Sequence, residues 1–458
     1  MACKMISREN LKGCFAILMA CFGLAPLGQA ATLANMMPYL ASYLHSHTDA
    51  ALDYSHSIWI SCCLHAIQGI STPLTTTLLP KVGLRPLLFV AWLIHSLGIL
   101  LTMVTLKVGF WAVICTYAIM TGWGIGSSYG LLLSAAASWF PNHRGLVVGI
   151  CTCGFGAGAI ILTPIQTLII NPNNTAVNNE SQMFDDEDLL QRVPKCLLIV
   201  GGIMACLQLI GFIFVHPRPE EKKIETGDIL MDDFNNNSTF LHDGLNDTDL
   251  PPGKVLKKVD IYLFWTIMCF SIIPLTLITA TVKVVGQRSI PDDKYLSTVG
   301  TLGAAFNTLS RIAWGPVGDH FSYKVPLICL NCFYGIILIT LPFIPSIATA
   351  GKYLFAVWVV CIYLCVAGNF VFIPFGISRA FGHKYFAANY AIVFSAFLPG
   401  SLICALIVYF VTLEHYLTEI FTACGVICIG SSITALFLYD TSAPKNCQAI
   451  HCHRRKDK

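Results

Sequence analysis

The sequence predicts an all-α membrane protein with 12 transmembrane helices that form two six-helix pseudo-repeats. Composition is the first reason, because 55% of the residues are hydrophobic and only 12% are charged, against about 25% charged in a soluble domain. The second is a mean hydropathy of +0.68. The third is a succession of apolar runs of about 20 residues, the length that spans a bilayer as a helix. One soluble core could not bury this much apolar surface.

Twelve spans are expected along the chain, most of them separated by short polar turns. They lie near 13–40, 57–79, 86–105, 109–138, 146–169, 195–215, 260–282, 295–318, 325–345, 353–378, 387–410 and 415–438. The first apolar run has no short hydrophobic core followed by a clean cleavage site. We therefore interpret it as a span and not as a signal peptide.

One long polar segment divides the spans into six and six. It is rich in acidic residues and contains Pro251-Pro252-Gly253, a composition that cannot bury a core. We therefore predict four parts of the chain. They are an N-terminal six-helix bundle (1–216), a flexible cytoplasmic linker (217–259), a C-terminal six-helix bundle (260–440) and a basic cytoplasmic tail (441–458).

The two sets of six spans resemble a repeat. The basic turn at Arg85, after the second span, has a counterpart at Lys324 after the eighth. The turn that ends at Arg144 has a counterpart at Lys384, with almost the same spacing. Two such pairs favour duplication of a six-span unit, which is a feature of transporters.

The distribution of positive charge predicts the orientation. With both termini in the cytoplasm, 20 of the 28 Lys and Arg residues lie in cytoplasmic segments and seven in outer ones, as the positive-inside rule requires. The sequons at Asn173 and Asn179 then fall in an outer loop, where they can be glycosylated. Residues 225–230 weakly resemble an acidic dileucine sorting signal, yet we expect the plasma membrane rather than an endolysosomal one.

Several classes of protein are disfavoured. A net charge of +3 is too small to indicate a nucleic-acid partner. The spans hold no paired carboxylates, zinc-ligand spacing or nucleophile–base pair, so we expect neither an enzyme nor a bound cofactor. Most of the 20 cysteines lie in apolar runs and are expected to pack as small hydrophobic residues. Cys447 and Cys452, beside two histidines in the tail, leave palmitoylation and a metal site as alternatives.

Arg311 is the strongest candidate for a functional residue. It lies about 24 Å from one end of the eighth span and about 12 Å from the other. A charge at this depth costs about 2.5 kcal/mol or more, so it normally faces a water-filled cavity or a partner. No Asp or Glu lies in the middle of any span. Either a substrate anion is the partner, which suits a guanidinium, or polar neighbours on the helices hold Arg311.

Asn307, Asn35 and Tyr39 are the other candidate substrate-binding residues. Asn307 precedes Arg311 by one helical turn, so both lie on one face. Asn35, Tyr39 and Tyr43 follow a four-residue stripe that can line a cavity. The alternatives are that the asparagines join helices and that the tyrosines anchor the interface.

Charged and titratable residues elsewhere have weaker signals. His65, in the second span, is a possible proton relay, although a lone buried histidine is more often packed and hydrogen-bonded. Asp319, Arg144 and Lys384 lie at predicted cytoplasmic ends of spans and are candidate gate residues.

Closely spaced glycines occur in the fifth span, at Gly154, Gly156 and Gly158. They resemble part of a dinucleotide fingerprint, but that fingerprint follows a strand, and none is expected here. We interpret them as surfaces that let membrane helices approach closely.

Several of these stretches resemble a known family. Residues 139–150, followed by 154–159, resemble the turn and fifth span of the oxalate/formate antiporter branch of the major facilitator superfamily (MFS), to which monocarboxylate transporters are related. Residues 35–43, 310–319 and 389–394 resemble its first, eighth and eleventh spans. The resemblance implies the MFS fold and a rocker-switch carrier for small organic anions. It places Arg311 at the arginine that holds the substrate carboxylate.

The chain departs from that pattern at three positions. Oxalate carriers of this branch have a lysine in the eleventh span, and its place falls near Phe397. Proton-coupled monocarboxylate transporters have an aspartate where this chain has Asn307. They also have a lysine in the first span, where this chain has none beyond Lys12. The departures favour a monocarboxylate over oxalate and disfavour proton coupling through a carboxylate.

We therefore expect a membrane carrier for a small monocarboxylate of the lactate, pyruvate or formate type, working by alternating access. Its expected partners are the organic anion, the lipid bilayer and, as an open question, an accessory membrane subunit. Two alternatives stay open. They are a carrier for a neutral or cationic solute, and a non-transporting membrane receptor on a carrier fold.

Overall fold

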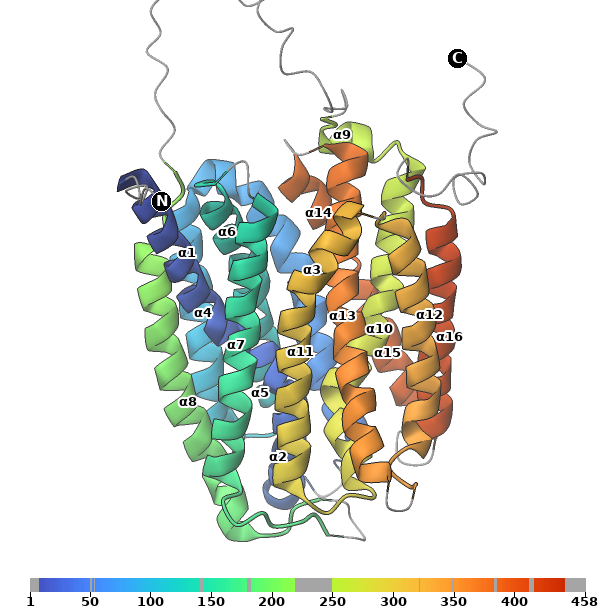
Figure 1. The fold of residues 1–458 in the computed structure, drawn as a ribbon. Helices are drawn as coiled ribbons and strands as arrows, with labels where there is room; N and C mark the ends of the chain where they lie inside the picture. The colour runs from blue at the N-terminus through green and yellow to red at the C-terminus, as the bar shows by residue number, and fades with distance from the viewer. Residues whose placement is uncertain are drawn as a thin grey trace, which may run out of the picture.

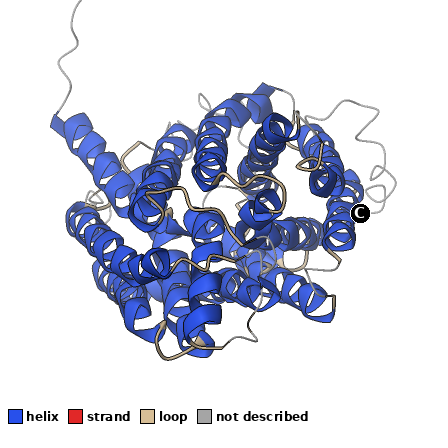
Figure 2. Cartoon of the chain, turned by 90° about the horizontal axis from the view of Figure 1, so that it is seen from below, coloured by secondary structure: helices blue, strands red, loops and turns tan. Residues whose placement is uncertain are grey.

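The fold is that of a helical bundle in which long helices run side by side. A computed structural model describes residues 8–49, 52, 54–140, 144–178, 183–218, 249–320, 322–347, 350–382, 385–411 and 416–440. Within these ranges every regular element is a helix and none is a strand (Figure 2). The side chains of 8, 54, 55, 144–146, 319 and 320 are not described.

The elements before the long polar segment are here called the first half. They are α1 (Arg8–Leu27), α2 (Gln29–His47), α3 (Tyr54–Val82), α4 (Leu84–Thr105), α5 (Phe110–Val113), the π-helix η1 (Ile114–Met120), α6 (Thr121–Ala137), α7 (Arg144–Ile170) and α8 (Glu187–Phe214).

The elements after that segment are the second half. They are α9 (Pro252–Val255), α10 (Val259–Gln287), α11 (Asp293–His320), α12 (Lys324–Thr340), the short 3-10 helix η4 (Leu341–Phe343), α13 (Gly351–Phe381), α14 (Phe386–Phe394), α15 (Phe397–Phe410) and α16 (Leu417–Leu436).

The described elements form twelve rods, as the fold-class prediction requires. Three rods are interrupted: α1 and α2 meet at Gly28, η1 joins α5 to α6, and a two-residue turn separates α14 from α15. Ten of the described rods have both the length and the apolar composition of a membrane span. The other two, α3 and α11, are long enough but more polar. Four candidate functional positions lie on these two rods: His65 on α3 and Asn307, Arg311 and Asp319 on α11.

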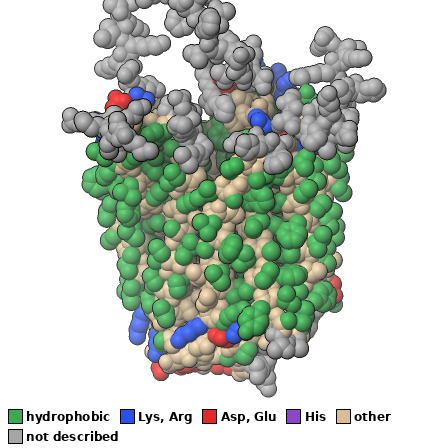
Figure 3. All heavy atoms as spheres, in the orientation of Figure 1, with side chains coloured by type: hydrophobic (Ala, Val, Ile, Leu, Met, Phe, Trp, Pro, Cys, Tyr) green, Lys and Arg blue, Asp and Glu red, His purple; other side chains and the backbone are tan. Residues whose placement is uncertain are grey.

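The molecule has two polar ends and an apolar side surface. Helix α1 begins, and α16 ends, at the end that carries α9 (Figure 1); we call it the α9 end and the opposite one the α2 end. Large apolar side chains such as Trp111, Ile161 and Val426 are exposed around the sides, while charged side chains gather at the two ends (Figure 3). An apolar belt of this size marks a surface that faces lipid.

Glycines bring α1 and α7 into close contact, as the sequence predicted. A Cβ atom on Gly158 would lie 1.8 Å from the carbonyl oxygen of Ala25, and one on Gly154 would lie 2.8 Å from the Cα of Cys21. Neither distance is physically possible for a larger residue, so the two helices can pack this closely only with glycine at these positions.

The predicted linker differs from the structure at its end. Most of it, and the whole predicted tail, lie outside the described residues. Its last residues, however, are attached to the second half, because Leu250 N donates to Phe381 O (3.0 Å) and Asn389 Nδ2 donates to Leu250 O (3.1 Å). Helix α9 follows, and α10 begins at Val259. Acidic composition alone could not show these backbone contacts.

Candidate functional site

Arg311 lies half-buried on α11, where the two halves face each other. Its Nε donates to Asn307 Oδ1 (3.3 Å), and its Nη1 donates to the hydroxyl of Tyr129 on α6 (3.4 Å). Its guanidinium carbon is 5.6 Å from the centre of the Phe370 ring on α13. A guanidinium has five N–H donors, and both bonds are long for hydrogen bonds. Donor capacity is therefore left for a ligand.

An aromatic wall, formed by Phe370, Tyr390, Phe394 and Phe397, extends from Arg311. Phe397 stacks on Phe394 with ring centres 4.0 Å apart and planes 12° apart, and it lies 6.2 Å from Phe370. Tyr390 continues the wall beside Phe394. Apolar rings thus occupy the position at which the family resemblance places a second cation in oxalate carriers.

Asn307 positions Arg311 through its own bond to the backbone. Its Nδ2 donates to the carbonyl oxygen of Tyr363 on α13 (2.9 Å), which fixes the amide so that its oxygen faces the guanidinium. None of the ion pairs between described residues involves Arg311. The positive charge is therefore held by neutral groups and an aromatic face in the described part of the chain.

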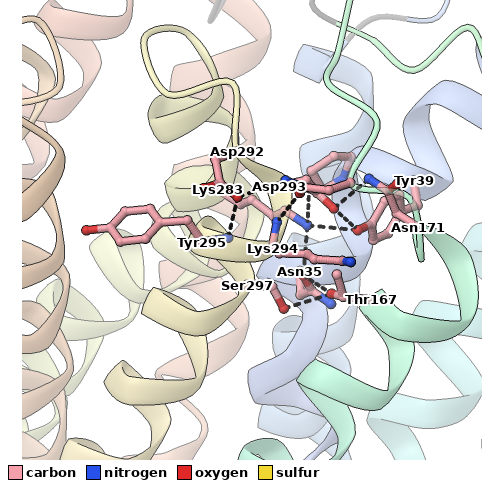
Figure 4. A network of polar contacts seen from close by, with 12 residues as sticks. Asn35, Tyr39, Thr167, Asn171, Lys283, Asp292, Asp293, Lys294, Tyr295 and Ser297 are labelled. Carbon is pink, nitrogen blue, oxygen red and sulfur yellow. Dashed lines mark hydrogen bonds and ion pairs between the residues drawn. The ribbon is translucent and has the colours of Figure 1, made fainter.

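Asn35 and Tyr39 lie in a different place, in a group of side chains here called the α2-end cluster (Figure 4). Its members come from both halves. They are Asn35, Tyr39, Thr167 and Asn171 of the first half and Lys283, Asp293 and Ser297 of the second.

A buried ion pair is the centre of this cluster. Lys283 Nζ lies 2.8 Å from Asp293 Oδ1, and the side chains of the two residues are only 4% and 2% exposed. Lys283 Nζ also donates to Asn35 Oδ1 (2.8 Å) and to the Tyr39 hydroxyl (3.2 Å). Buried charges are tolerated when paired and hydrogen-bonded in this way.

The first half completes the coordination of the carboxylate. The hydroxyl of Tyr39 and the Nδ2 of Asn171 (3.0 Å) both donate to Asp293 Oδ2. One turn further along α11, the hydroxyls of Ser297 and Thr167 are 2.7 Å apart. Every one of these bonds joins the two halves, so the α2 end is closed in this conformation.

A neighbouring turn adds a second set of contacts. Asp292, between α10 and α11, accepts from Asn174 Nδ2 (3.1 Å) and lies 3.2 Å from Lys352 Nζ. Burial raises the pKa of Asp292, but its hydrogen bonds from Tyr295 N, Asn174 and Lys352 outweigh that effect and hold the pKa below its ordinary value. Asp292 is therefore ionised at neutral pH and ties the loop after α7 to the second half.

The α2-end cluster and Arg311 are too far apart to hold one small anion. Ser297 and Arg311 are both on α11, and a rise of about 1.5 Å per residue separates them by about 21 Å. The structure thus brings Asn307 together with Arg311 but places Asn35 and Tyr39 elsewhere. The expected four-residue substrate site is divided into two groups in this conformation.

Comparison with known proteins now gives the family. The model of the family described as Major Facilitator Superfamily matches residues 15–386. The chain belongs to this superfamily. The D-xylose-proton symporter shares the MFS fold, with a TM-score of 0.67 and 13% identity over 93% of this chain and 98% of that one. The chain is therefore an integral, multi-pass membrane protein of a transporter family.

Relatives within the superfamily have low identity to this chain. Apicoplast pyruvate carrier 1 of Toxoplasma gondii is 21% identical over 79% of this chain and 71% of its own length. The oxalate:formate antiporter of Oxalobacter formigenes is 25% identical over 62% of this chain and 60% of its own length. Monocarboxylate transporter 9 of Rattus norvegicus is 22% identical over 36% of this chain and 30% of its own length. These relatives confirm the family resemblance.

Seven residues of the two groups were missed from the sequence, namely Tyr129 and Phe370 beside Arg311, and Thr167, Asn171, Lys283, Asp293 and Ser297 in the α2-end cluster. Lys283 and Asp293 were assigned to an outer loop because the predicted spans ended at 282 and resumed at 295, whereas α10 ends at Gln287 and α11 begins at Asp293. A lysine and an aspartate that flank a short turn are a weak signal of such a pair. Tyr129 and Phe370 had no signal, since aromatic residues are common in spans.

The remaining candidates keep the status of predictions. His65 Nδ1 lies 2.9 Å from the carbonyl oxygen of Ser61, and its ring centre is 6.4 Å from that of Phe397. It is therefore next to the aromatic wall. Ser61 in turn joins the halves through the Thr279 hydroxyl (2.8 Å).

The gate and glycosylation candidates are only partly described. Lys384 and Asn179 lie outside the described residues, as do the side chains of Arg144 and Asp319. Asn173 lies exposed in the loop between α7 and α8, at the same end as the α2-end cluster.

Proposed function

We propose that this MFS protein carries a small monocarboxylate of the lactate, pyruvate or formate type by alternating access, with Arg311 binding the carboxylate. The observation that supports this most is the half-buried Arg311 guanidinium, whose described contacts are neutral. A substrate carboxylate supplies the missing negative charge, and bidentate hydrogen bonds to a guanidinium orient it.

The names of the relatives support the same substrate class. They include a pyruvate carrier, an oxalate:formate antiporter and a monocarboxylate transporter. Aromatic rings at Phe397 and Phe394 favour one carboxylate per substrate, because a second carboxylate against them would lose its hydration without gaining a partner. Oxalate is therefore expected to be a poor substrate.

In the membrane, we place the α9 end in the cytoplasm. The predicted cytoplasmic segments carry most of the Lys and Arg residues, and the positive-inside rule favours this orientation. The α2-end cluster then lies toward the outside. We expect the plasma membrane as the location.

Uptake into liposomes tests the substrate class. The purified protein is reconstituted, and uptake of labelled lactate, pyruvate, formate and oxalate is compared between wild type, Arg311→Gln and Arg311→Lys. Hydrogen bonds to a charged group contribute about 1.5–3 kcal/mol, so Arg311→Gln is expected to lower monocarboxylate uptake at least about tenfold. Arg311→Lys keeps the charge but loses the bidentate geometry. Its uptake is expected to lie between that of wild type and that of Arg311→Gln.

An exposed cation away from the interface serves as the control. Lys107→Gln, in the turn after α4, should transport as wild type does. Full monocarboxylate uptake by Arg311→Gln would overturn the role of Arg311 as the carboxylate site, whereas absence of monocarboxylate binding and uptake in the wild type would favour a neutral or cationic solute. Specific binding of a monocarboxylate without uptake would instead indicate a receptor on a carrier fold.

A further inference from the structure

We propose that the α2-end cluster is the gate that closes the α2 end of the carrier, and that Asn35 and Tyr39 are gating residues rather than substrate ligands. The proposal follows from the bonds of the cluster and from its distance to Arg311. It does not depend on which solute is carried.

The division of charge between the halves is the first step of the argument. Both charged members, Lys283 and Asp293, belong to the second half, while the first half contributes amides and hydroxyls. When the halves separate at this end, Lys283 and Asp293 remain an ion pair. Within the cluster, the bonds that break are those to Asn35, Tyr39, Thr167 and Asn171. Opening therefore separates no opposite charges.

Burial is the second step. At 4% and 2% exposure, the side chains of Lys283 and Asp293 are almost completely shielded from water in this conformation. Lys283 Nζ lies over the Tyr39 ring, 4.4 Å from its centre, and Phe184 stacks on the same ring with ring centres 5.2 Å apart. Tyr39 thus covers the ion pair from the first half, and movement of α2 away from α10 would admit water to it.

The third step concerns the two carboxylate oxygens of Asp293, which have different partners. Oδ1 faces Lys283 within the second half, whereas Oδ2 accepts from Tyr39 and Asn171 of the first half. The carboxylate is oriented by the lysine and used as an acceptor by the opposite half. Loss of Lys283 would leave Asp293 without its orienting partner, and loss of Asp293 would leave a buried cation unpaired.

Hydrogen–deuterium exchange of the full-length protein in nanodiscs tests the gate without any substrate. Tyr39→Phe removes only the hydroxyl that joins the halves. We expect amide exchange in α2 and in the first turns of α11 to become about tenfold faster, as for loss of hydrogen bonds to charged groups. Exchange in α16, which contributes no residue to the cluster, should not change.

A matched variant controls for the loss of a buried hydroxyl. The hydroxyl of Tyr334 on α12 is buried and has no hydrogen-bond partner among the described residues. Tyr334→Phe should therefore leave exchange in α2 and α11 at the wild-type rate. The proposal is overturned if Tyr39→Phe matches Tyr334→Phe, or if its exchange rises equally in α16.

Variants of the ion pair separate gating from folding. Asp293→Asn leaves Lys283 as an unpaired buried charge, and we expect it to lower the unfolding temperature as well as to open the gate. In the double variant Lys283→Met with Asp293→Asn, the unfolding temperature should recover while exchange in α2 stays fast. Recovery of both quantities together would show a purely structural pair and contradict the gate.

A transport readout distinguishes gating residues from ligands. Asn35→Val and Tyr39→Phe should change the maximal rate and leave KM for a carried monocarboxylate within about twofold, whereas Arg311→Lys should raise KM. A KM change in Tyr39→Phe as large as that in Arg311→Lys would return Tyr39 to the substrate site. Absence of any transport would contradict the substrate proposal but not the gate, since the hydrogen–deuterium exchange experiment needs no substrate.

Discussion

Asn307, one helical turn before Arg311, determines the chemistry around the guanidinium. Asn307 accepts from the guanidinium and is held by the backbone of α13, so the charge is positioned without being neutralised. An aspartate in the same place would neutralise it. The identity of this one side chain therefore determines whether Arg311 is available to an external anion.

Asn307→Asp should weaken binding of the substrate anion at Arg311. The new carboxylate would lie where the amide oxygen is now, 3.3 Å from Arg311 Nε, and would compete with the substrate anion. We expect monocarboxylate uptake at pH 7 to fall at least about tenfold, as for a lost charged hydrogen bond. Uptake by this variant is measured at pH 7 and at pH 5.

Asn307→Ala is the control for this variant, since it removes the amide without adding charge. It should retain more uptake than Asn307→Asp at both pH values. Equal activity of the two variants would show that the orientation of Arg311, and not its charge balance, limits transport.

The contact between Arg311 and Asn307 was predictable, because residues four apart on a helix meet. The Lys283–Asp293 pair was not. It depends on where α10 ends and α11 begins, which composition defines only to within several residues, and on α2 of the other half covering it. Asn35 and Tyr39 were correctly recognised as a polar stripe, but the stripe could not show which level of the bundle it faces.

Helices α7 and α11 approach each other closely across the two halves. A Cβ atom on Gly156 would lie 1.7 Å from Thr308 Oγ1 and 2.8 Å from Thr308 Cβ. Thr308 is one turn from Arg311 on α11, so this contact fixes the height at which the arginine meets the first half.

Gly156→Ala should separate these two helices. Overpacking of this kind costs about 1–3 kcal/mol, and we expect at least a fivefold loss of transport because the conformation with α7 against α11 is disfavoured. Adding Thr308→Ala removes the nearest atom and should recover part of the activity.

The same helix provides the control, since a Cβ atom on Gly149 would meet nothing within 4 Å. Gly149→Ala should behave as wild type. If both glycine variants fail equally, helix flexibility rather than the α7–α11 contact is responsible.

At the level of elements, glycine spacing predicted close packing of the fifth span but not its partners. Gly154 and Gly158 face α1, whereas Gly156 faces α11 of the other half. Likewise, the π-helix η1 in the fourth rod and the breaks at Gly28 and after α14 were missed, because apolar runs continue through them without a change of composition.

In the proposed alternating-access cycle, the whole molecule must change the side of the membrane from which Arg311 is accessible. A loaded carrier closes around a neutral pair, and an empty one closes around an unpaired charge, which costs more free energy. We expect efflux of labelled monocarboxylate from loaded liposomes to be about tenfold faster with unlabelled substrate outside than into substrate-free medium. Net efflux as fast as exchange would contradict this expectation.

The architecture was the most predictable property of the chain. Spans of about 20 apolar residues and two recurring turns sufficed for a six-plus-six arrangement, because a bilayer permits few alternatives. The residues between 219 and 248 and after 440, where sorting and modification signals were sought, lie outside the described residues.

The placement of Lys283 and Asp293 on one half has an electrical consequence. Because they move together, opening the α2 end carries no net charge through the membrane potential, which acts with about 2.3 kcal/mol per elementary charge per 100 mV. In the proposed cycle and orientation, the potential therefore acts on the empty carrier through the charge of Arg311, which a bound monocarboxylate neutralises. A negative cell interior attracts the Arg311 charge and so favours the empty conformation that is open to the cytoplasm. We expect the empty carrier to rest in this conformation, with its α2 end closed and its site accessible to substrate from the cytoplasm.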